Sequence, residues 1–346
     1  MKDSPSPSLP VRTLGKSGIK VPILGFGGAP LGDLYAKLDE KEAIEAVTTS
    51  FEHGVRLFDT SPLYGSGLSE HRIGSALRHV SAQDVILSTK VGRVADPFHS
   101  PDTPGFYAGG LPHTLRSDYT YDGALRSTEQ SLLRLGTDHI DVVLVHDLDR
   151  WTHGEELQKY YDEAANGCVR ALKELKAEKV IGAFGVGVNE SDSALNFCRD
   201  FDPDVVLLAG RYSLLEQPAL LDLLPYANEH EIGIILGGVF NSGILATGNI
   251  PGARYNYGEP GKEIRDRVSS MERICEEYEL PLRRASLQFV FGHPSVSAVV
   301  LGAVSPDEVI QNCSDFQAPV PAGFWDRLRQ ENLISADAPT PLPSFL

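Results

Sequence analysis

Short apolar runs alternate with longer amphipathic stretches along most of the chain. In eight of these runs most apolar residues are successive rather than alternating, which is typical of parallel strands buried on both faces. The predicted strands are Leu24–Gly28, Leu57–Asp59, Val85–Lys90, Ile140–His146, Ile181–Val186, Val205–Ala209, Ile232–Gly237 and Val299–Leu301. Between them, apolar residues recur at helical spacing, as in Tyr121–Leu135 and Ile264–Tyr278. The pattern predicts an α/β fold, a closed (β/α)8 TIM barrel with an outer ring of helices.

Three segments fall outside this alternation. Before the first strand, RTLGKSGIKVP predicts a β-hairpin that turns at Gly15–Gly18 and plugs the bottom of the barrel. Two long connections, Val94–Asp118 and Leu148–Gly167, follow strands at their C-terminal ends, where long loops usually build a substrate site. We therefore expect one barrel domain over residues 11–330, a disordered or draped tail over residues 1–10 and a Pro-rich tail over residues 331–346.

Composition narrows the range of partners. The chain has 346 residues, and 31 Lys and Arg against 47 Asp and Glu give a formal net charge of −16. Such an acidic surface repels phosphate backbones and anionic membranes, so we expect no nucleic-acid or membrane partner. There is no apolar stretch of roughly 18 residues and no signal-peptide pattern at the N-terminus, which indicates a cytoplasmic protein, a monomer or a homodimer. The four cysteines have no metal-ligand spacing, so we expect reduced thiols and no metal site.

Polar side chains stand at the C-terminal ends of neighbouring predicted strands. Asp59 ends the second strand, Tyr64 lies in the loop that follows, Lys90 ends the third strand and His146 ends the fourth. Each residue alone has a structural explanation: a helix cap, a lysine that reaches solvent or a hydrogen-bonded core histidine. Four such residues on one rim of a barrel favour an active site.

The four side chains together suit proton transfer coupled to hydride transfer. A tyrosine hydroxyl titrates near 10, and we expect the Lys90 ammonium to lower the pKa of Tyr64. Asp59 would keep Lys90 charged, and His146 would align the substrate oxygen. Tyr64 could then take a proton from an alcohol while hydride leaves the carbon. Because no side chain accepts hydride, this chemistry requires an organic cofactor.

In order along the chain, the segments RTLGKSGIKVPILGFGG, RLFDTSPLYGSGLSEHRIGSALR, ILSTKVGR, SLLRLGTDHIDVVLVHD and LGAVSPDEVIQN resemble the aldo-keto reductase superfamily over nearly the whole length. The resemblance implies a barrel oxidoreductase in which Asp59, Tyr64, Lys90 and His146 form the catalytic tetrad, with Tyr64 as general acid and base. It also implies a nicotinamide dinucleotide. The implied cofactor contacts are Asn189 at the carboxamide, Gly237, Phe240, Asn241, Ser242, Gly243 and Leu245 at the pyrophosphate, and Gly302, Ser305, Glu308 and Asn312 at the adenosine half.

The nicotinamide pocket departs from the family pattern. Val188 precedes Asn189 where a serine is common, and Ala209 stands where a glutamine is common. Phe240 is the candidate aromatic residue for stacking on the nicotinamide.

The loop after the last strand also departs from the pattern. It has two acids, Asp307 and Glu308, and no cation, whereas a 2′-phosphate needs cationic partners. We therefore expect NAD to be preferred over NADP. The two acids could equally stabilise the first turn of a helix, and both interpretations can hold together.

The segments DTSPLYG, STKVGR, HDLDRWTHG and GVGVNE resemble one branch of the superfamily, which oxidises aldoses or pyridoxal. The resemblance implies NAD-dependent oxidation of an aldose of the L-fucose, D-arabinose or L-galactose type at its C1 hemiacetal, giving a lactone. Candidate substrate contacts in the long loops are Arg93, Tyr119, Asp147, Asp149, Trp151 and His153. The alternatives are oxidation of pyridoxal, NADPH-dependent reduction of aldehydes or ketones, and a regulatory subunit that binds the cofactor without turnover.

Overall fold

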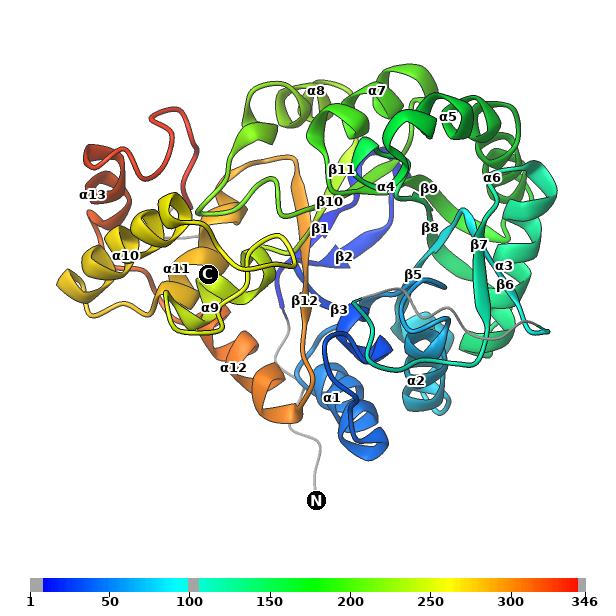
Figure 1. The fold of residues 1–346 in the computed structure, drawn as a ribbon, viewed down its shortest axis with the longest axis horizontal. Coiled ribbons are helices and arrows are strands. Elements are labelled where there is room, and N and C mark those ends of the chain that lie inside the picture. The colour runs from blue at the N-terminus through cyan, green and yellow to red at the C-terminus, as the bar shows by residue number, and fades with distance from the viewer. Residues whose placement is uncertain (1–8, 99–105, 342–346) are drawn as a thin grey trace.

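Eight parallel strands close into a barrel in the computed structural model, which describes residues 9–98 and 106–341. The strands follow one another around the barrel in the order β10-β11-β12-β3-β4-β5-β8-β9, so that each strand pairs with its neighbours in the chain (Figure 1). They are β3 (Leu24–Gly27), β4 (Leu57–Asp59), β5 (Ile86–Val91), β8 (Ile140–His146), β9 (Ile181–Val188), β10 (Val205–Ala209), β11 (Gly233–Gly237) and β12 (Val296–Gly302). The predicted fold class is confirmed, and the last strand is longer than its apolar run suggested.

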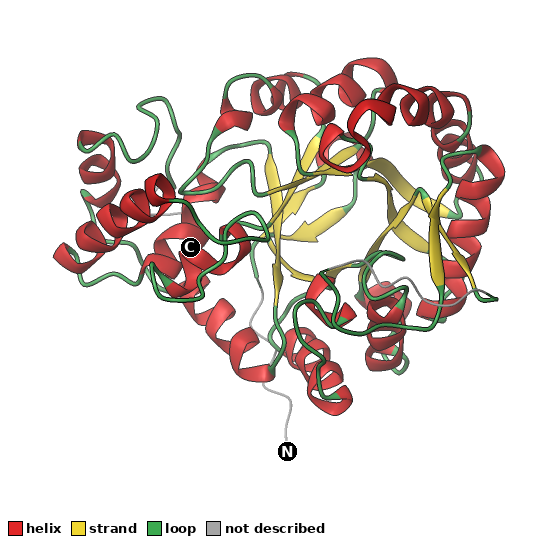
Figure 2. Ribbon diagram, in the orientation of Figure 1, coloured by secondary structure: helices red, strands yellow, loops and turns green. Residues whose placement is uncertain are grey.

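Helices surround the strands (Figure 2). The helices that alternate with the strands are α1 (Glu40–Glu52), α2 (Leu68–Leu77), α3 (Tyr121–Leu135), α6 (Cys168–Ala177), α7 (Ser191–Phe201), α8 (Leu223–Glu229), α11 (Leu282–Phe289) and α12 (Pro306–Gln317). Three more, α9 (Ile244–Thr247), α10 (Lys262–Glu277) and α13 (Phe324–Gln330), gather at one side, on the left in Figure 1. The ends of α3 show why the sequence folds this way, because the Thr120 side chain accepts the Gly123 N–H and the left-handed Gly136 ends the helix.

Apolar side chains form two buried clusters. One fills the inside of the barrel and includes Leu57, Leu144, Leu207, Ile235 and Val300. The other lies between the strands and the helices, so that each strand is buried on both faces. Full burial of each large aliphatic side chain contributes about 1.5–3 kcal/mol. The two clusters explain why the strands show as continuous apolar runs in the sequence.

The predicted N-terminal hairpin closes the bottom of the barrel. Strands β1 (Val11–Thr13) and β2 (Lys20–Pro22) pair antiparallel, and Leu14 and Val21 are fully buried in the cluster inside the barrel. Between the strands, Gly15 has φ of +50°, and a Cβ atom there would lie 2.2 Å from the backbone nitrogen of Gly233. Only glycine fits this approach.

The two long connections are more regular than expected. The first carries an antiparallel pair, β6 (Arg93–Asp96) and β7 (Thr114–Ser117), and part of the segment between them, residues 99–105, lies outside the described residues. The second carries two helices, α4 (Arg150–His153) and α5 (Leu157–Asn166). The sequence pattern did not indicate these elements, because they are short and partly exposed and lack a strong apolar period. Both connections nonetheless contribute side chains to the cavity described below.

The C-terminal segment packs on the barrel as far as it is described. Arg267 Nη2 donates to the Leu333 carbonyl at 2.7 Å, and Arg329 Nη2 donates to the Ala338 carbonyl at 2.9 Å. Most of the predicted N-terminal tail lies outside the described residues, and the domain boundaries stay a prediction. Among the described helices none is both long and apolar enough to cross a membrane. The same residues hold no cluster of three or more metal-ligating side chains, and all four cysteines are buried and free.

Candidate active site

Strand register brings the predicted site residues together inside the barrel. Asp59 on β4 pairs with Ser88 on β5, and Lys90 lies two residues further along β5 on the same face. The partner of Lys90 on β8 is followed, again two residues later, by His146. Because side chains alternate along a strand, a step of two keeps every one of them pointing into the barrel. Each site residue therefore stands one step higher than the previous one.

The same step places Asn189 after β9. His146 pairs with Gly187, and Asn189 follows two residues later. A Cβ atom at Gly187 would lie 3.4 Å from Lys90 Cε, so this position is in contact range of the lysine stem. The four predicted positions from consecutive strands thus lie side by side on one rim.

Lys90 and Asp59 form a buried ion pair. Lys90 Nζ donates to Asp59 Oδ2 and to the Thr60 carbonyl, both at 2.7 Å, and Ser88 Oγ donates to Asp59 Oδ1 at 2.8 Å. The Lys90 residue is 1% exposed and Asp59 is 3% exposed. Burial raises the pKa of the Asp59 carboxyl, and the charge of Lys90 opposes that rise. Each charge compensates the other, so removing one alone would leave a costly buried ion.

Tyr64 stands above this pair in the loop that follows β4. Lys90 Nζ lies 4.9 Å from the centroid of the Tyr64 ring, and the His146 ring meets it edge-on with 5.9 Å between centroids. Burial raises the pKa of Tyr64 well above its usual value, and the nearby Asp59 charge raises it further. The expectation of a lowered pKa for Tyr64 was therefore wrong, because burial and Asp59 raise it. The ammonium is already paired with Asp59 and the Thr60 carbonyl, whereas the phenolate would be buried.

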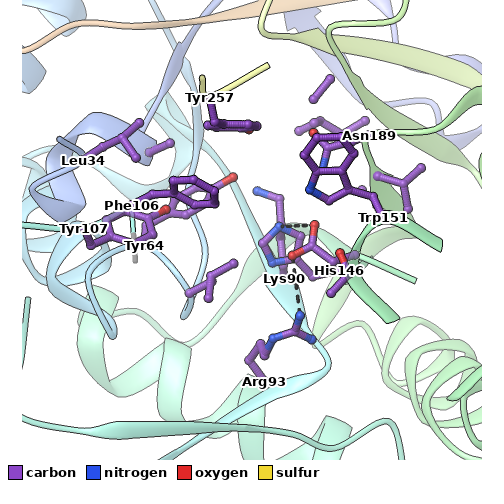
Figure 3. Close-up of a pocket in the computed structure, with 18 residues that line it drawn as sticks. Leu34, Tyr64, Lys90, Arg93, Phe106, Tyr107, His146, Trp151, Asn189 and Tyr257 are labelled. Carbon is purple, nitrogen blue, oxygen red and sulfur yellow. Dashed lines mark ion pairs between the residues drawn. The ribbon is translucent and has the colours of Figure 1, made fainter. Parts of the chain in front are cut away.

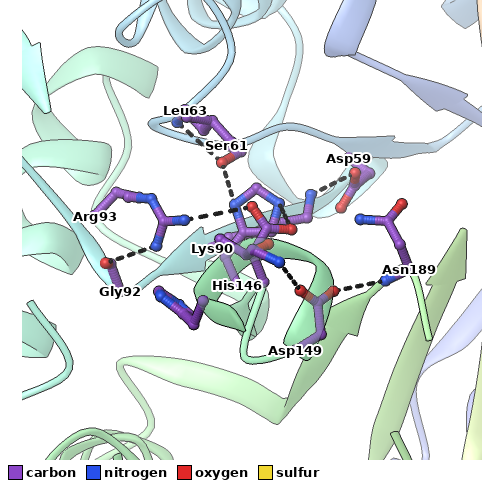
Figure 4. Close-up of polar contacts among 12 residues, drawn as sticks. Asp59, Ser61, Leu63, Lys90, Gly92, Arg93, His146, Asp149 and Asn189 are labelled. Carbon is purple, nitrogen blue, oxygen red and sulfur yellow. Dashed lines mark hydrogen bonds and ion pairs between the residues drawn. The ribbon is translucent and has the colours of Figure 1, made fainter. Parts of the chain in front are cut away.

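His146 is held as a neutral ring. Its Nδ1 lies 3.0 Å from Ser61 Oγ, and its Nε2 lies 3.4 Å from Asp147 Oδ1 (Figure 4). Burial lowers the pKa of His146 well below its usual value, and the charges of Lys90 and Arg93 lower it further. Because Ser61 Oγ accepts the Leu63 N–H and can donate its own proton to Nδ1, we assign the single ring proton to Nε2. His146 can therefore donate to an oxygen atom in the cavity.

A cavity opens over these residues (Figure 3). Five aromatic side chains line it: Tyr64, Phe106, Tyr107, Trp151 and Tyr257. The Phe106 and Tyr257 rings lie 5.1 Å apart between centroids. Sequence reasoning missed Phe106, Tyr107 and Tyr257, which come from segments with no strand or helix pattern. Polar groups converge on the same cavity from Lys90, Arg93, His146, Asp147, Thr152 and Asn189.

A second, smaller cavity continues from the first. The two share Trp151, Asn189, Ala209 and Tyr257, and the second is also lined by Gly210, Arg211, Gly238, Asn241, Ser242 and Asn256. The backbone is left-handed at four of the positions from 238 to 243: Gly238 (φ 61°), Asn241 (φ 47°), Ser242 (φ 61°) and Gly243 (φ 109°). Backbone turns of this kind point N–H groups at an anion. Arg211, which sequence reasoning missed, also lines this cavity, and its charge is paired with Glu216 Oε2 at 3.1 Å. The fit of the cradle to the pyrophosphate of a dinucleotide therefore depends on its backbone groups.

Phe240 lies away from both cavities. Neither cavity includes it, and the Arg283 guanidinium lies 5.3 Å from the centroid of its ring. Phe240 is therefore a poor candidate for stacking on the nicotinamide. Tyr257 lines both cavities beside Asn189, and its backbone N–H donates to Ser242 Oγ at 3.0 Å. Tyr257 is thus the aromatic residue best placed for that contact.

In the loop after β12, the acidic side chain of Glu308 binds a backbone N–H group. Ser305 caps α12, and the Glu308 carboxylate accepts the Val304 N–H at 2.9 Å. This contact supports the interpretation that Glu308 stabilises the start of the helix. A Cβ atom at Gly302 would lie 2.7 Å from the Pro30 ring, which leaves little room for a basic side chain at that position. Nearby, Asn312 accepts a hydrogen bond from Arg283, a contact that the sequence did not indicate.

The predicted substrate residues divide into two groups. Arg93, Asp147 and Trp151 line the cavity, and Trp151 is 53% exposed. Three others lie outside it: Tyr119, Asp149 and His153. The fully buried Tyr119 hydroxyl donates to the His146 carbonyl at 2.6 Å and lies 2.9 Å from His153 Nε2, so both support the site from behind.

Asp149 is also occupied by backbone groups. Its carboxylate accepts the N–H groups of Thr152 at 2.9 Å and Asn189 at 3.1 Å (Figure 4). The residue is fully buried, so the expectation that Asp149 contacts substrate was wrong.

A profile of the Aldo/keto reductase family matches residues 23–332. The chain is 38% identical over 336 residues to pyridoxal 4-dehydrogenase of Microbacterium luteolum, a match that covers 94% of this chain and 98% of that protein. It is 36% identical over 331 residues to D-threo-aldose 1-dehydrogenase of a Pseudomonas species, covering 94% and 97%. An aldo-keto reductase of Bacillus halodurans, solved in its holo form, superposes with a TM-score of 0.73 at 26% identity and covers 95% of this chain and 98% of that one.

Fold and matches together define a barrel oxidoreductase that acts on CH–OH or carbonyl groups of a small molecule. The chain belongs to the aldo/keto reductase family, whose members bind nicotinamide cofactors. The resemblance predicted from the motifs is thereby confirmed.

Proposed function

We propose that this chain is an NAD-dependent dehydrogenase that oxidises a cyclic hemiacetal, most favourably the C1 hydroxyl of an aldose, to a lactone. The observation that carries the proposal is the placement of Tyr64 over the Lys90–Asp59 pair, with His146 beside it at the floor of an aromatic cavity. Of these four groups we assign Tyr64 as the one that takes the proton of an alcohol and returns a proton in the reverse reaction.

Each residue has a separate task in this mechanism. His146 Nε2–H donates to the reacting oxygen and orients it toward Tyr64. Tyr64 takes the hydroxyl proton as the C–H bond breaks, and Lys90, fixed by Asp59, stands 4.9 Å from the centroid of the Tyr64 ring. A bound nicotinamide supplies the hydride acceptor. Because burial keeps the pKa of Tyr64 high, we expect oxidation to become faster as pH rises, whereas carbonyl reduction uses the phenol in its protonated form.

The residues present fit a dinucleotide laid across both cavities. Asn189 would bind the carboxamide, and the backbone of the left-handed segment 238–243 would hold the pyrophosphate beside Arg211. Ser305, Glu308 and Asn312 would then flank the adenosine. Of the predicted pyrophosphate contacts, Asn241 and Ser242 line the cradle, whereas Gly237 and Leu245 stay expectations from the resemblance.

The charges near the adenosine positions support NAD over NADP. Glu308 and Asp307 stand in the first turn of α12. The nearby cation Arg283 is already paired with Asp315, whose Oδ2 lies 2.9 Å from Arg283 Nε. A 2′-phosphate would therefore meet two acids and a cation that is already neutralised. The ratio of kcat/KM for NAD to that for NADP tests this choice directly, and a ratio below one would overturn it.

Pyridoxal is the second candidate substrate. One relative is named a pyridoxal 4-dehydrogenase, and the rings of Trp151, Tyr257 and Phe106 offer faces on which a pyridine could stack. Initial rates with NAD against L-fucose, D-arabinose, L-galactose and pyridoxal separate the candidates. Tyr64→Phe serves as the inactive control.

The same assay distinguishes the other classes of function. Faster reduction of aldehydes or ketones with NADPH would identify a reductase. Binding of a dinucleotide without turnover of any substrate would indicate a regulatory subunit.

A further inference from the structure

A guanidinium and a carboxylate face each other on the cavity wall beside His146. Arg93 Nη2 lies 3.6 Å from Asp147 Oδ2, and His146 Nε2 lies 3.4 Å from Asp147 Oδ1. Both distances exceed the roughly 2.7–2.9 Å of a good charge-assisted hydrogen bond. The Asp147 carboxylate therefore keeps lone pairs with which to accept hydrogen bonds from a ligand.

Both side chains are held in place before any ligand arrives. Asp147 has a left-handed backbone (φ 52°), and its N–H donates to the Gly187 carbonyl at 2.9 Å. Arg93 Nη1 donates to the Tyr119 hydroxyl at 2.9 Å, which leaves Nη2 toward Asp147. Non-glycine residues adopt this backbone conformation at a cost, and such positions concentrate at binding sites. Here the turn is the point at which the chain leaves β8 and delivers a carboxylate to the cavity.

Charge in the cavity is balanced. Lys90 is paired with Asp59, and Arg93 faces Asp147. Among the described residues that line the cavity, no further side chain carries a formal charge when His146 is neutral. Arg93 and Asp147 thus offer one donor and one acceptor with no net charge, which matches hydroxyl groups better than a phosphate or a carboxylate.

We propose that Arg93 and Asp147 bind the hydroxyl group next to the reacting one, so that the enzyme selects substrates that carry a vicinal diol. His146 fixes the position of the two hydroxyl groups, because its Nε2 donates to the reacting oxygen and lies 3.4 Å from Asp147 Oδ1. A neighbouring hydroxyl then donates to the Asp147 carboxylate and accepts from Arg93. This assignment rests on the proposed function, names its substrate class as polyhydroxylated hemiacetals, and makes Asp147 a specificity residue.

The test compares D-arabinose with 2-deoxy-D-ribose, which is the same pentose without its C2 hydroxyl. A site built to bind a hydroxyl can reject an analogue that lacks it by up to about 10⁴–10⁵-fold. We expect kcat/KM of the wild type to favour D-arabinose by at least about 100-fold, and Asp147→Asn to reduce that preference below about tenfold. Arg93→Lys keeps the positive charge but loses the planar set of guanidinium donors, so it should give an intermediate preference. An unchanged preference in both variants would overturn the proposal.

Binding measurements separate this proposal from the proposed function. Dissociation constants of both sugars are measured by calorimetry on Tyr64→Phe with NAD present, and again on Tyr64→Phe combined with Asp147→Asn. Weaker binding of the deoxy sugar that depends on Asp147 supports the diol site even if the wild type turns over neither sugar. Turnover of D-arabinose with equal binding of both sugars would support the proposed dehydrogenase and overturn the proposed diol site. Melting temperatures of all variants show whether each one is folded.

Discussion

Asn189 is fixed in the site through Asp149, whose carboxylate accepts the Asn189 backbone N–H at 3.1 Å while also capping α4. Asp149 touches neither cavity, yet it connects the helix that carries Trp151 to the residue assigned to the nicotinamide carboxamide. The contact is a buried, charge-assisted hydrogen bond, so its loss affects both ends.

Asp149→Ala should therefore weaken NAD binding without changing the proton-transfer step. We expect the dissociation constant for NAD to rise by about tenfold and the free energy of unfolding to fall by about 1–2 kcal/mol, because a buried helix cap is lost. Quenching of intrinsic fluorescence measures the first and urea denaturation the second. Asp192→Ala, in the first turn of α7, is the matched acid control. Unchanged NAD affinity in Asp149→Ala would show that Asn189 is positioned by other contacts.

Tyr64→Phe should reduce kcat by about 10²–10⁴-fold while leaving NAD affinity within a factor of about two, since only the general acid and base is lost. Tyr107 provides a matched control, because its ring lies 6.5 Å from that of Tyr64 between centroids and lines the same cavity. Tyr107→Phe should keep most of the activity. Equal losses in the two variants would mean that the cavity shape, and not the Tyr64 hydroxyl, carries the effect.

Activity toward a polyol should fall in acid through Asp147. Burial raises the pKa of Asp147 to about 6, with Asp149 acting in the same direction and Arg93 and Lys90 opposing it. His146 faces the same carboxylate but stays neutral, since its pKa is lowered. The carboxylate is ionised above about pH 6 and protonated below it, so 1/KM for the sugar should rise between pH 5 and pH 7. Asp147→Asn should remove this rise, and a profile identical to that of the wild type would contradict the assignment.

Glu308→Arg should shift the enzyme toward NADP. The change removes a carboxylate and adds a cation beside the adenosine positions, so we expect kcat/KM for NADP to increase by about tenfold. It also removes the acceptor of the Val304 N–H, which should cost about 1 kcal/mol of the free energy of unfolding. Asp307→Arg is the control on the same turn, for which no such backbone contact is observed. Steady-state kinetics with both cofactors decide, and a drop in NADP activity would refute the role of this loop.

Gly15→Ala should destabilise the whole barrel. The added Cβ would lie 2.2 Å from the Gly233 nitrogen, and the backbone is left-handed, so we expect a loss above about 2 kcal/mol. Gly18→Ala is the matched control, because Gly18 is also left-handed (φ +77°) but a Cβ atom there would have no described neighbour within 4 Å. That variant should lose only about 1 kcal/mol. Chemical denaturation compares the two, and equal losses would show that the hairpin does not seal the barrel as tightly as the contact suggests.

The sequence predicted the barrel and the placement of Asp59, Lys90 and His146 because each follows directly from an apolar strand. The apolar run that marks a buried strand is local in the sequence, so strand ends can be found from the pattern alone. Phe106 and Tyr257 could not be found in this way, because they lie in irregular segments that are far apart in the chain and meet only in the folded protein.

The electrostatic expectation for Tyr64 failed for a related reason. The presence of Lys90 nearby was predicted correctly, but its pairing with Asp59 and the depth of the phenol depend on three-dimensional packing. Phe240 shows the same limit, since the sequence does not give the direction of its side chain, which faces Arg283 and lines neither cavity.

The hairpin fills the lower end of the barrel with Leu14 and Val21, whereas the described residues that line the cavity lie at the opposite, C-terminal end of the strands. Trp151 and Tyr257 line both cavities at this end, so under the proposed function substrate and dinucleotide would share one entrance between the segments that carry them. We therefore expect substrate and dinucleotide to bind and to leave in a fixed order. We expect the more deeply bound molecule to leave last, so that its release, and not proton transfer, limits turnover.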